Sequence, residues 1–176
     1  MTFTDREFWT VIHGMGFGAV FLLAFAGGLA GLWSFRPELA TPAGLKERLR
    51  RLLAGTWIMA IIAWLTVIVG TYTVYPWYRA KPPEGADLRD YPRSYLLADE
   101  NLAGWHTFAM EWKEHVAWMT PILATAVAFV VLRYGLRLAE DPHLRRACIV
   151  LFTIAFLAAA VAGMFGAFIT KAAPIY

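Results

Sequence analysis

Four long apolar runs alternate with polar stretches along the chain, and each run is long enough to cross a membrane as a helix. A helix needs about 20 apolar residues to span roughly 30 Å of hydrocarbon. The predicted helices cover residues 8–35, 52–77, 105–134 and 146–170. A long polar loop, 78–104, joins the second helix to the third. The pattern predicts an all-α integral membrane protein: an antiparallel, up-and-down four-helix bundle that forms one domain over residues 1–176.

The composition supports a lipid environment. Hydrophobic residues make up 59% of the chain, charged residues make up 16%, and the mean hydropathy is +0.51. A soluble domain carries roughly a quarter charged residues, so this chain is too apolar for water. The formal net charge of +3 does not indicate nucleic-acid binding, because the basic residues sit in short loops between apolar runs. The expected partner is therefore the lipid bilayer, with no nucleic acid.

The two short connecting loops carry nine of the sixteen lysines and arginines. These nine are Arg36, Lys46, Arg48, Arg50, Arg51, Arg133, Arg137, Arg145 and Arg146. Short cytoplasmic loops of membrane proteins are enriched in Lys and Arg. We therefore expect these loops in the cytoplasm, and both termini and loop 78–104 on the non-cytoplasmic side. The compact chain with short loops favours a multi-pass protein of the bacterial inner (cytoplasmic) membrane.

Two features predict how the helices pack. Small residues that recur every four positions let two helix backbones approach closely, and the fourth helix has such a stripe: Ala155, Ala159, Gly163 and Ala167. Proline removes one backbone hydrogen bond from a helix. Pro121 should therefore kink the third helix one turn beyond His115.

Two histidines lie in the predicted spans at similar depth. Counting back about 20 residues from Trp33 leads to His13, and counting back from Arg133 leads near His115. Ionisable residues inside a membrane are costly and are candidates for function by default. The second helix reaches the same depth with the stretch TYTVYPW at residues 71–77. The two histidines at matching depth on two helices are the strongest candidates for a functional site in the sequence.

Such a pair suits a non-covalently bound haem b, with His13 and His115 as axial ligands, because bundles commonly hold cofactors between facing helices. The chain has one cysteine, which excludes covalent attachment of a c-type haem through two thiols. Further cofactor-binding candidates, for orienting the group or holding its propionates, are Tyr72, Tyr75, Arg79 and Lys113. Glu111 and Glu114 are the candidates for proton exchange.

The expected function is a membrane b-type cytochrome, and the general plan resembles the small four-helix membrane cytochromes b. It would hold the haem near the outer, periplasmic face. It would pass electrons between quinol, a possible second cofactor, and a periplasmic or membrane redox subunit. Whether the protein is an enzyme stays open at this point.

Two alternatives compete with the cytochrome. One is a non-haem metal site built from His13, His115 and nearby glutamates. His106 is a further metal candidate at the rim, although nine residues separate it from His115 and a continuous helix would turn the two apart. The other alternative is a non-catalytic membrane subunit of a larger respiratory or photosynthetic complex, in which these polar groups satisfy one another.

Overall fold

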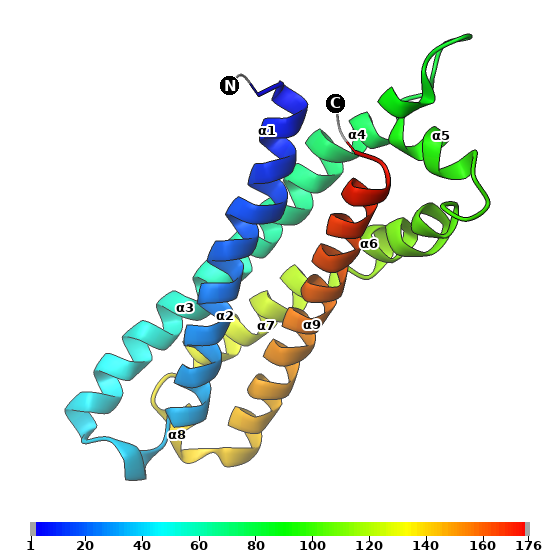
Figure 1. The fold of residues 1–176 in the computed structure, drawn as a ribbon. Helices are drawn as coiled ribbons and strands as arrows, with labels where there is room; N and C mark the ends of the chain where they lie inside the picture. The colour runs from blue at the N-terminus through cyan, green and yellow to red at the C-terminus, as the bar shows by residue number, and fades with distance from the viewer. Residues whose placement is uncertain (1–2, 175–176) are drawn as a thin grey trace. The chain divides into compact units, whose positions relative to one another are not determined.

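The computed structural model describes residues 3–174, and in this range the chain forms helices and turns without a strand. Four helices are long and apolar enough to cross a membrane, which confirms the prediction of four spans. They cover Asp5–Ser34, Pro42–Tyr78, Trp105–Tyr134 and Pro142–Ala172 (Figure 1). The protein is therefore all-α and multi-pass, as the apolar pattern indicates.

Three of the four spans consist of several helical segments. The first span contains α1 (Asp5–Val11), η1 (Ile12–Gly16) and α2 (Phe17–Ser34). The second contains α3 (Pro42–Val69), η3 (Gly70–Val74) and α4 (Tyr75–Tyr78). The third contains η5 (Trp105–Met110), α6 (Glu111–His115) and α7 (Met119–Tyr134), and the fourth is α9 (Pro142–Ala172). Short helices in the connections are η2 (Pro37–Leu39), η4 (Leu88–Asp90), α5 (Pro92–Leu97) and α8 (Arg137–Glu140).

Helices α3 and α9 begin earlier than the apolar pattern predicts, because polar residues cap them. The Thr41 hydroxyl accepts the N–H of Gly44 at 3.2 Å. The Asp141 carboxylate accepts the N–H groups of His143 and Leu144 at 3.0 and 2.9 Å. Side-chain oxygens at these positions satisfy the first N–H groups of a helix. The apolar runs thus mark only the part of each helix that suits lipid.

The third span is interrupted between α6, which ends at His115, and α7, which begins at Met119. The residues between them form turns. Pro121 has no N–H to donate to the carbonyl of Ala117, four residues earlier. The α-helix is therefore broken in the turn before Pro121, where the sequence predicts a kink.

The chain packs as two compact units, and each takes a segment from all four spans. Unit 1 contains Leu65–Trp118, the first 18 residues and the chain from Ala159 onward. Unit 2 contains Ala19–Trp64 and Met119–Ala158. Both ends of the chain and the long loop therefore belong to unit 1, and the two basic loops belong to unit 2.

Aromatic rings and a glycine hold the first and fourth spans together in unit 2. Phe25 stacks on Phe156 with ring centroids 3.9 Å apart and an interplanar angle of 7°. The same ring lies 5.6 Å from Phe152, which is fully buried. Gly28 allows this approach, since a Cβ there would lie 2.7 Å from a ring atom of Phe152. Close packing at a small residue is the usual basis of helix association in lipid.

The small-residue stripe predicted on the fourth helix is only partly buried. Ala155 is buried, but Gly163 and Ala167 are exposed. The buried apolar face of α9 instead follows Phe152, Ala155, Ala158, Ala162 and Ile169. Each four-residue step turns an α-helix by about 400°, so a stripe with that spacing drifts by roughly 40° per step. After three steps it has left the packed face, and this part of the prediction was wrong.

In unit 1 the long loop folds onto the helix ends. Leu96 of α5 is fully buried in a cluster with Tyr78, Met110 and Ile169. Arg6 of α1 donates to the carbonyl of Asp90 at 3.2 Å. The loop therefore has a hydrophobic contact and a polar contact with the spans it connects.

The exposed part of this loop has its own ion pair. The Arg89 guanidinium lies 2.6 Å from the Asp87 carboxylate. Hydrogen bonds from the side chain and backbone of Arg89 hold the pKa of Asp87 below its usual range. The loop is thus shaped locally before it reaches α5.

Candidate functional site

Three spans of unit 1 contain a π-helical segment, in which a turn is wider than in an α-helix. Segment η1 carries His13, η3 begins at Gly70, and η5 carries His106. Over residues 3–174, every π segment falls in unit 1. Such segments are rare and occur frequently at functional sites. Unit 1 is therefore the part of the chain in which a functional site is expected.

The His13 ring packs against the backbone of Gly70. A Cβ atom at position 70 would lie 2.6 Å from Cε1 of the ring and 3.3 Å from each ring nitrogen. The ring hydrogen-bonds the backbone of Thr66. Its Nδ1 atom is buried and has no hydrogen-bond partner among the described residues. His13 thus keeps one unpaired nitrogen inside the protein.

Lys113 also lies on a glycine of a neighbouring helix. A Cβ at Gly166 would come within 2.5 Å of the Lys113 ammonium nitrogen. No ion pair between Lys113 and a carboxylate occurs in the described part of the chain. Lys113 lies close enough to His13 to act on it electrostatically. Two glycines therefore make room for two ionisable side chains within one unit.

Glu114 joins the second span to the third. The Tyr75 hydroxyl hydrogen-bonds the Glu114 carboxylate and accepts a hydrogen bond from Arg79 at 2.8 Å. The Arg79 guanidinium also lies over the Tyr75 ring, 5.4 Å from its centroid. Oε1 of Glu114 is buried and unpaired among the described residues. The Glu114 carboxylate is thus held by the Tyr75 hydroxyl and keeps Oε1 as a free hydrogen-bond acceptor.

Trp112 supplies the third unpaired buried polar atom, Nε1, and its ring packs edge-on against Phe165. In the described residues the set consists of His13 Nδ1, Trp112 Nε1 and Glu114 Oε1, and all three belong to unit 1. An unsatisfied buried polar group costs about 1–3 kcal/mol, and one in a native structure calls for a water, an ion or a ligand. We name His13, Lys113 and Glu114 the polar cluster; Trp112 is two residues from Glu114 on α6 and leaves the helix in the opposite direction. It offers acceptors and donors to a small polar molecule.

The structure does not bring His115 to His13. The His115 side chain is 72% exposed, and its Nδ1 lies 2.8 Å from the carbonyl oxygen of Glu111. Residues two apart on a helix point about 200° away from each other, so Lys113 and His115 leave α6 in opposite directions. No hydrogen bond or ion pair between His13 and His115 occurs in residues 3–174. Glu111 shares the exposed face of His115.

The other predicted site residues also include an exposed side chain and a buried one. Tyr72 is 73% exposed. His106 is buried, but both of its ring nitrogens have protein partners: the Tyr78 hydroxyl at 3.0 Å and Arg93 at 3.2 Å. Within the described residues no three His, Cys, Asp or Glu side chains lie together as a metal site. A haem or metal held by histidines therefore stays a prediction, and the geometry favours the polar cluster.

Three residues around the polar cluster were not predicted from the sequence: Trp112, Gly70 and Gly166. Trp112 is one of eight tryptophans and has no distinguishing neighbour in the sequence. Gly70 does have a possible signal, since glycine in a helix interior costs about 1 kcal/mol relative to alanine and often has a packing reason. Only the tertiary structure shows which side chain of a neighbouring helix fills the space beside this glycine.

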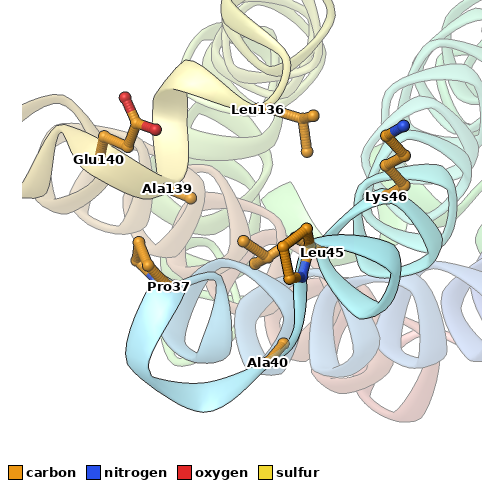
Figure 2. Close-up of a pocket in the computed structure, with 8 residues that line it drawn as sticks. Pro37, Ala40, Leu45, Lys46, Leu136, Ala139 and Glu140 are labelled. Carbon is orange, nitrogen blue, oxygen red and sulfur yellow. The ribbon is translucent and has the colours of Figure 1, made fainter.

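A separate cavity of about 330 Å³ lies in unit 2, between the two basic loops. It is lined by Pro37, Ala40, Pro42, Leu45, Lys46, Leu136, Ala139 and Glu140 (Figure 2). Most of these residues are apolar, and no unpaired buried polar atom of the described residues falls in this unit. The cavity therefore lacks the feature that marks the polar cluster.

Compared with known protein families, curated proteins and solved structures, the chain matches none of them.

Proposed function

We propose that the protein is a membrane subunit of an electron-transfer system and that its polar cluster binds the head group of a quinol. The observation that carries this proposal is the set of three buried, unpaired polar atoms in one unit of a membrane-embedded chain. Polar groups inside a membrane protein usually mark a pathway or a binding site.

A quinol matches the chemistry of the cluster. Its two hydroxyl groups can donate to the unpaired Nδ1 of His13 and Oε1 of Glu114. In the oxidised form a carbonyl oxygen can accept from Lys113. Its ring and tail are apolar and suit the aromatic surroundings, where Trp112 packs on Phe165. The same cluster would therefore bind both redox forms.

The residues would also take part in proton transfer. Oxidation of a quinol to a quinone releases two electrons and two protons. His13 and Glu114 would accept the protons, since each has a free acceptor atom and both residue types act as general bases. The electrons would pass one at a time to a one-electron acceptor held by a periplasmic or membrane partner subunit. The polar cluster positions the donor for that transfer.

A b-type haem is a second candidate, favoured by one observation. The contact of His115 Nδ1 with the Glu111 carbonyl fixes the ring and leaves Nε2 as the ligating nitrogen, an arrangement common among metal-bound histidines. Against it stand the exposed His115 side chain and the packing of His13 on Gly70. These two observations favour the quinol site over the haem.

We further propose that unit 1 faces the non-cytoplasmic side of the bacterial inner membrane, with antiparallel spans and both termini on that side. The positive-inside rule supports this orientation, because the two basic loops belong to unit 2. The polar cluster would then lie near the periplasmic face, where a soluble electron acceptor can reach it.

The first test is the absorption spectrum of the purified protein, followed by binding of a short-chain ubiquinol analogue to the protein in lipid nanodiscs. We expect no Soret band and saturable binding of one quinol per chain. His13→Gln should weaken binding roughly tenfold, the effect of losing about one hydrogen bond. His115→Gln is the matched control and should bind like the unchanged protein.

Other results would assign a different function. A Soret band that disappears in both His13→Ala and His115→Ala would establish the haem and overturn the quinol site. Stoichiometric iron, zinc or copper without colour would indicate the non-haem metal site. A colourless, metal-free protein that binds no quinol and co-purifies with other membrane subunits would support the non-catalytic role.

A further inference from the structure

A second polar group of unit 1 lies outside the polar cluster, where the long loop meets the spans. It consists of Arg93 on α5, His106 on η5 and Tyr78 on α4, which we name the loop clamp. Arg93 Nε donates to His106 Nε2 at 3.2 Å, and the Tyr78 hydroxyl lies 3.0 Å from His106 Nδ1. His106 is 7% exposed. One imidazole thus connects three separate helical segments.

The partners fix the protonation state of His106. An arginine side chain only donates hydrogen bonds, so Nε2 must be the unprotonated, accepting nitrogen. The ring proton is therefore on Nδ1, which donates to the Tyr78 oxygen. This is the neutral tautomer. A second proton, on Nε2, would remove the acceptor of the Arg93 bond and place two positive charges 3.2 Å apart.

Charged groups of both signs surround this histidine. Arg93 on α5 and Arg79 at the end of α4 are the cations in its surroundings, and Glu111 and Glu114 on α6 are the carboxylates. The Tyr78 ring of α4 lies beside it, tilted by 47° with ring centroids 5.8 Å apart. The Arg93 guanidinium makes a charged His106 incompatible with the closed contact, because both groups would then only donate hydrogen bonds. Histidine as a residue type changes its charge between about pH 5 and pH 8, so acidification is the way to test the two states.

We propose that the loop clamp is acid-sensitive: it holds α5 against α4 and η5 while His106 is neutral and releases α5 when His106 takes up a proton. Release would expose the buried contact of Leu96 with Tyr78 and Met110. The inference needs only the contacts of the loop and is independent of the quinol site. Its consequence is that the loop opens on the side of the membrane that becomes acidic.

The test is hydrogen–deuterium exchange of the full chain in nanodiscs, followed at the α5 peptide between about pH 8 and about pH 5, a range in which histidine titrates. Labelling times are scaled to the intrinsic exchange rate, and a peptide of α9 serves as the internal reference. We expect α5 to exchange roughly tenfold faster at the acidic end, the size expected from losing one hydrogen bond to a charged group.

Variants separate the clamp from general acid effects. His106→Gln keeps a donor and an acceptor but does not titrate, so α5 should stay protected across the range. Arg93→Met should leave α5 unprotected throughout. His143→Gln, at an exposed position in the first turn of α9, is the matched control and should follow the unchanged protein at the α5 peptide. An α5 peptide with constant protection in the unchanged protein, or an acid response that persists in His106→Gln, would overturn the clamp; unchanged α9 exchange verifies folding of each variant.

Discussion

The contact between His13 and Gly70 makes a quantitative prediction for Gly70→Ala. The added Cβ would lie 2.6 Å from Cε1 of the ring, whereas non-bonded carbon atoms prefer about 3.5–4.0 Å. The ring must therefore move by roughly an ångström, and overpacking of this kind costs about 1–3 kcal/mol. Replacement of a helical glycine by alanine gains about 1 kcal/mol, so the two effects partly cancel in the single variant.

Gly166→Ala is the matched control that isolates the steric cost. Its added Cβ would meet the Lys113 ammonium nitrogen at 2.5 Å, but that atom ends a flexible side chain and can turn away. Both variants share the helix-propensity gain. We therefore expect Gly70→Ala to be less stable than Gly166→Ala by about 1–3 kcal/mol.

The assay is reversible unfolding of each variant in mixed micelles, followed by circular dichroism. A double-mutant cycle adds a second criterion, because contacting residues show coupling energies of about 0.5–3 kcal/mol. Removal of the imidazole in His13→Ala should abolish the penalty of Gly70→Ala. Equal stability of the two glycine variants, or a penalty that persists without His13, would refute the packing of His13 on Gly70.

Two remaining predictions address packing in unit 2 and orientation in the membrane. Gly28→Ala should destabilise the protein by about 1–3 kcal/mol, because the new Cβ would lie 2.7 Å from the buried ring of Phe152. In the control Gly27→Ala the new Cβ meets no atom within 4 Å, so this variant should not be destabilised. Equal unfolding midpoints of the two variants would contradict the contact between Gly28 and Phe152. The orientation can be tested in a Cys148→Ala background with the single variants Lys46→Cys and Asp87→Cys and a membrane-impermeant maleimide. Lys46→Cys should be labelled in inverted vesicles and Asp87→Cys in right-side-out vesicles. Labelling of both variants from the same side of the membrane would exclude the proposed orientation.

The sequence alone determined the number and approximate extent of the spans. The reason is that crossing a hydrocarbon layer is a one-dimensional requirement, met by about 20 consecutive apolar residues. Local chemistry determined the interruption before Met119, because Pro121 lacks a donor whatever its surroundings. The first residues of α3 and α9 were harder to predict, because capping residues extend these helices beyond their apolar runs.

The sequence also identified much of the polar cluster and its surroundings. His13, Lys113, Glu114, Tyr75 and Arg79 all have polar or electrostatic contacts within unit 1. Ionisable residues in a span stand out in any apolar sequence, because lipid makes them costly. Residue type and depth were therefore sufficient to name these candidates.

Only the tertiary structure decided which of these residues share a face. Depth places His13 and His115 at one level, but the direction of a side chain depends on helix rotation, and the phase of α6 turns Lys113 inward and His115 outward. The π segments in the other spans change that phase again, and single-sequence periodicity does not reveal them. The space for His13 comes from a glycine on another helix, a contact between residues 57 positions apart that no local pattern encodes.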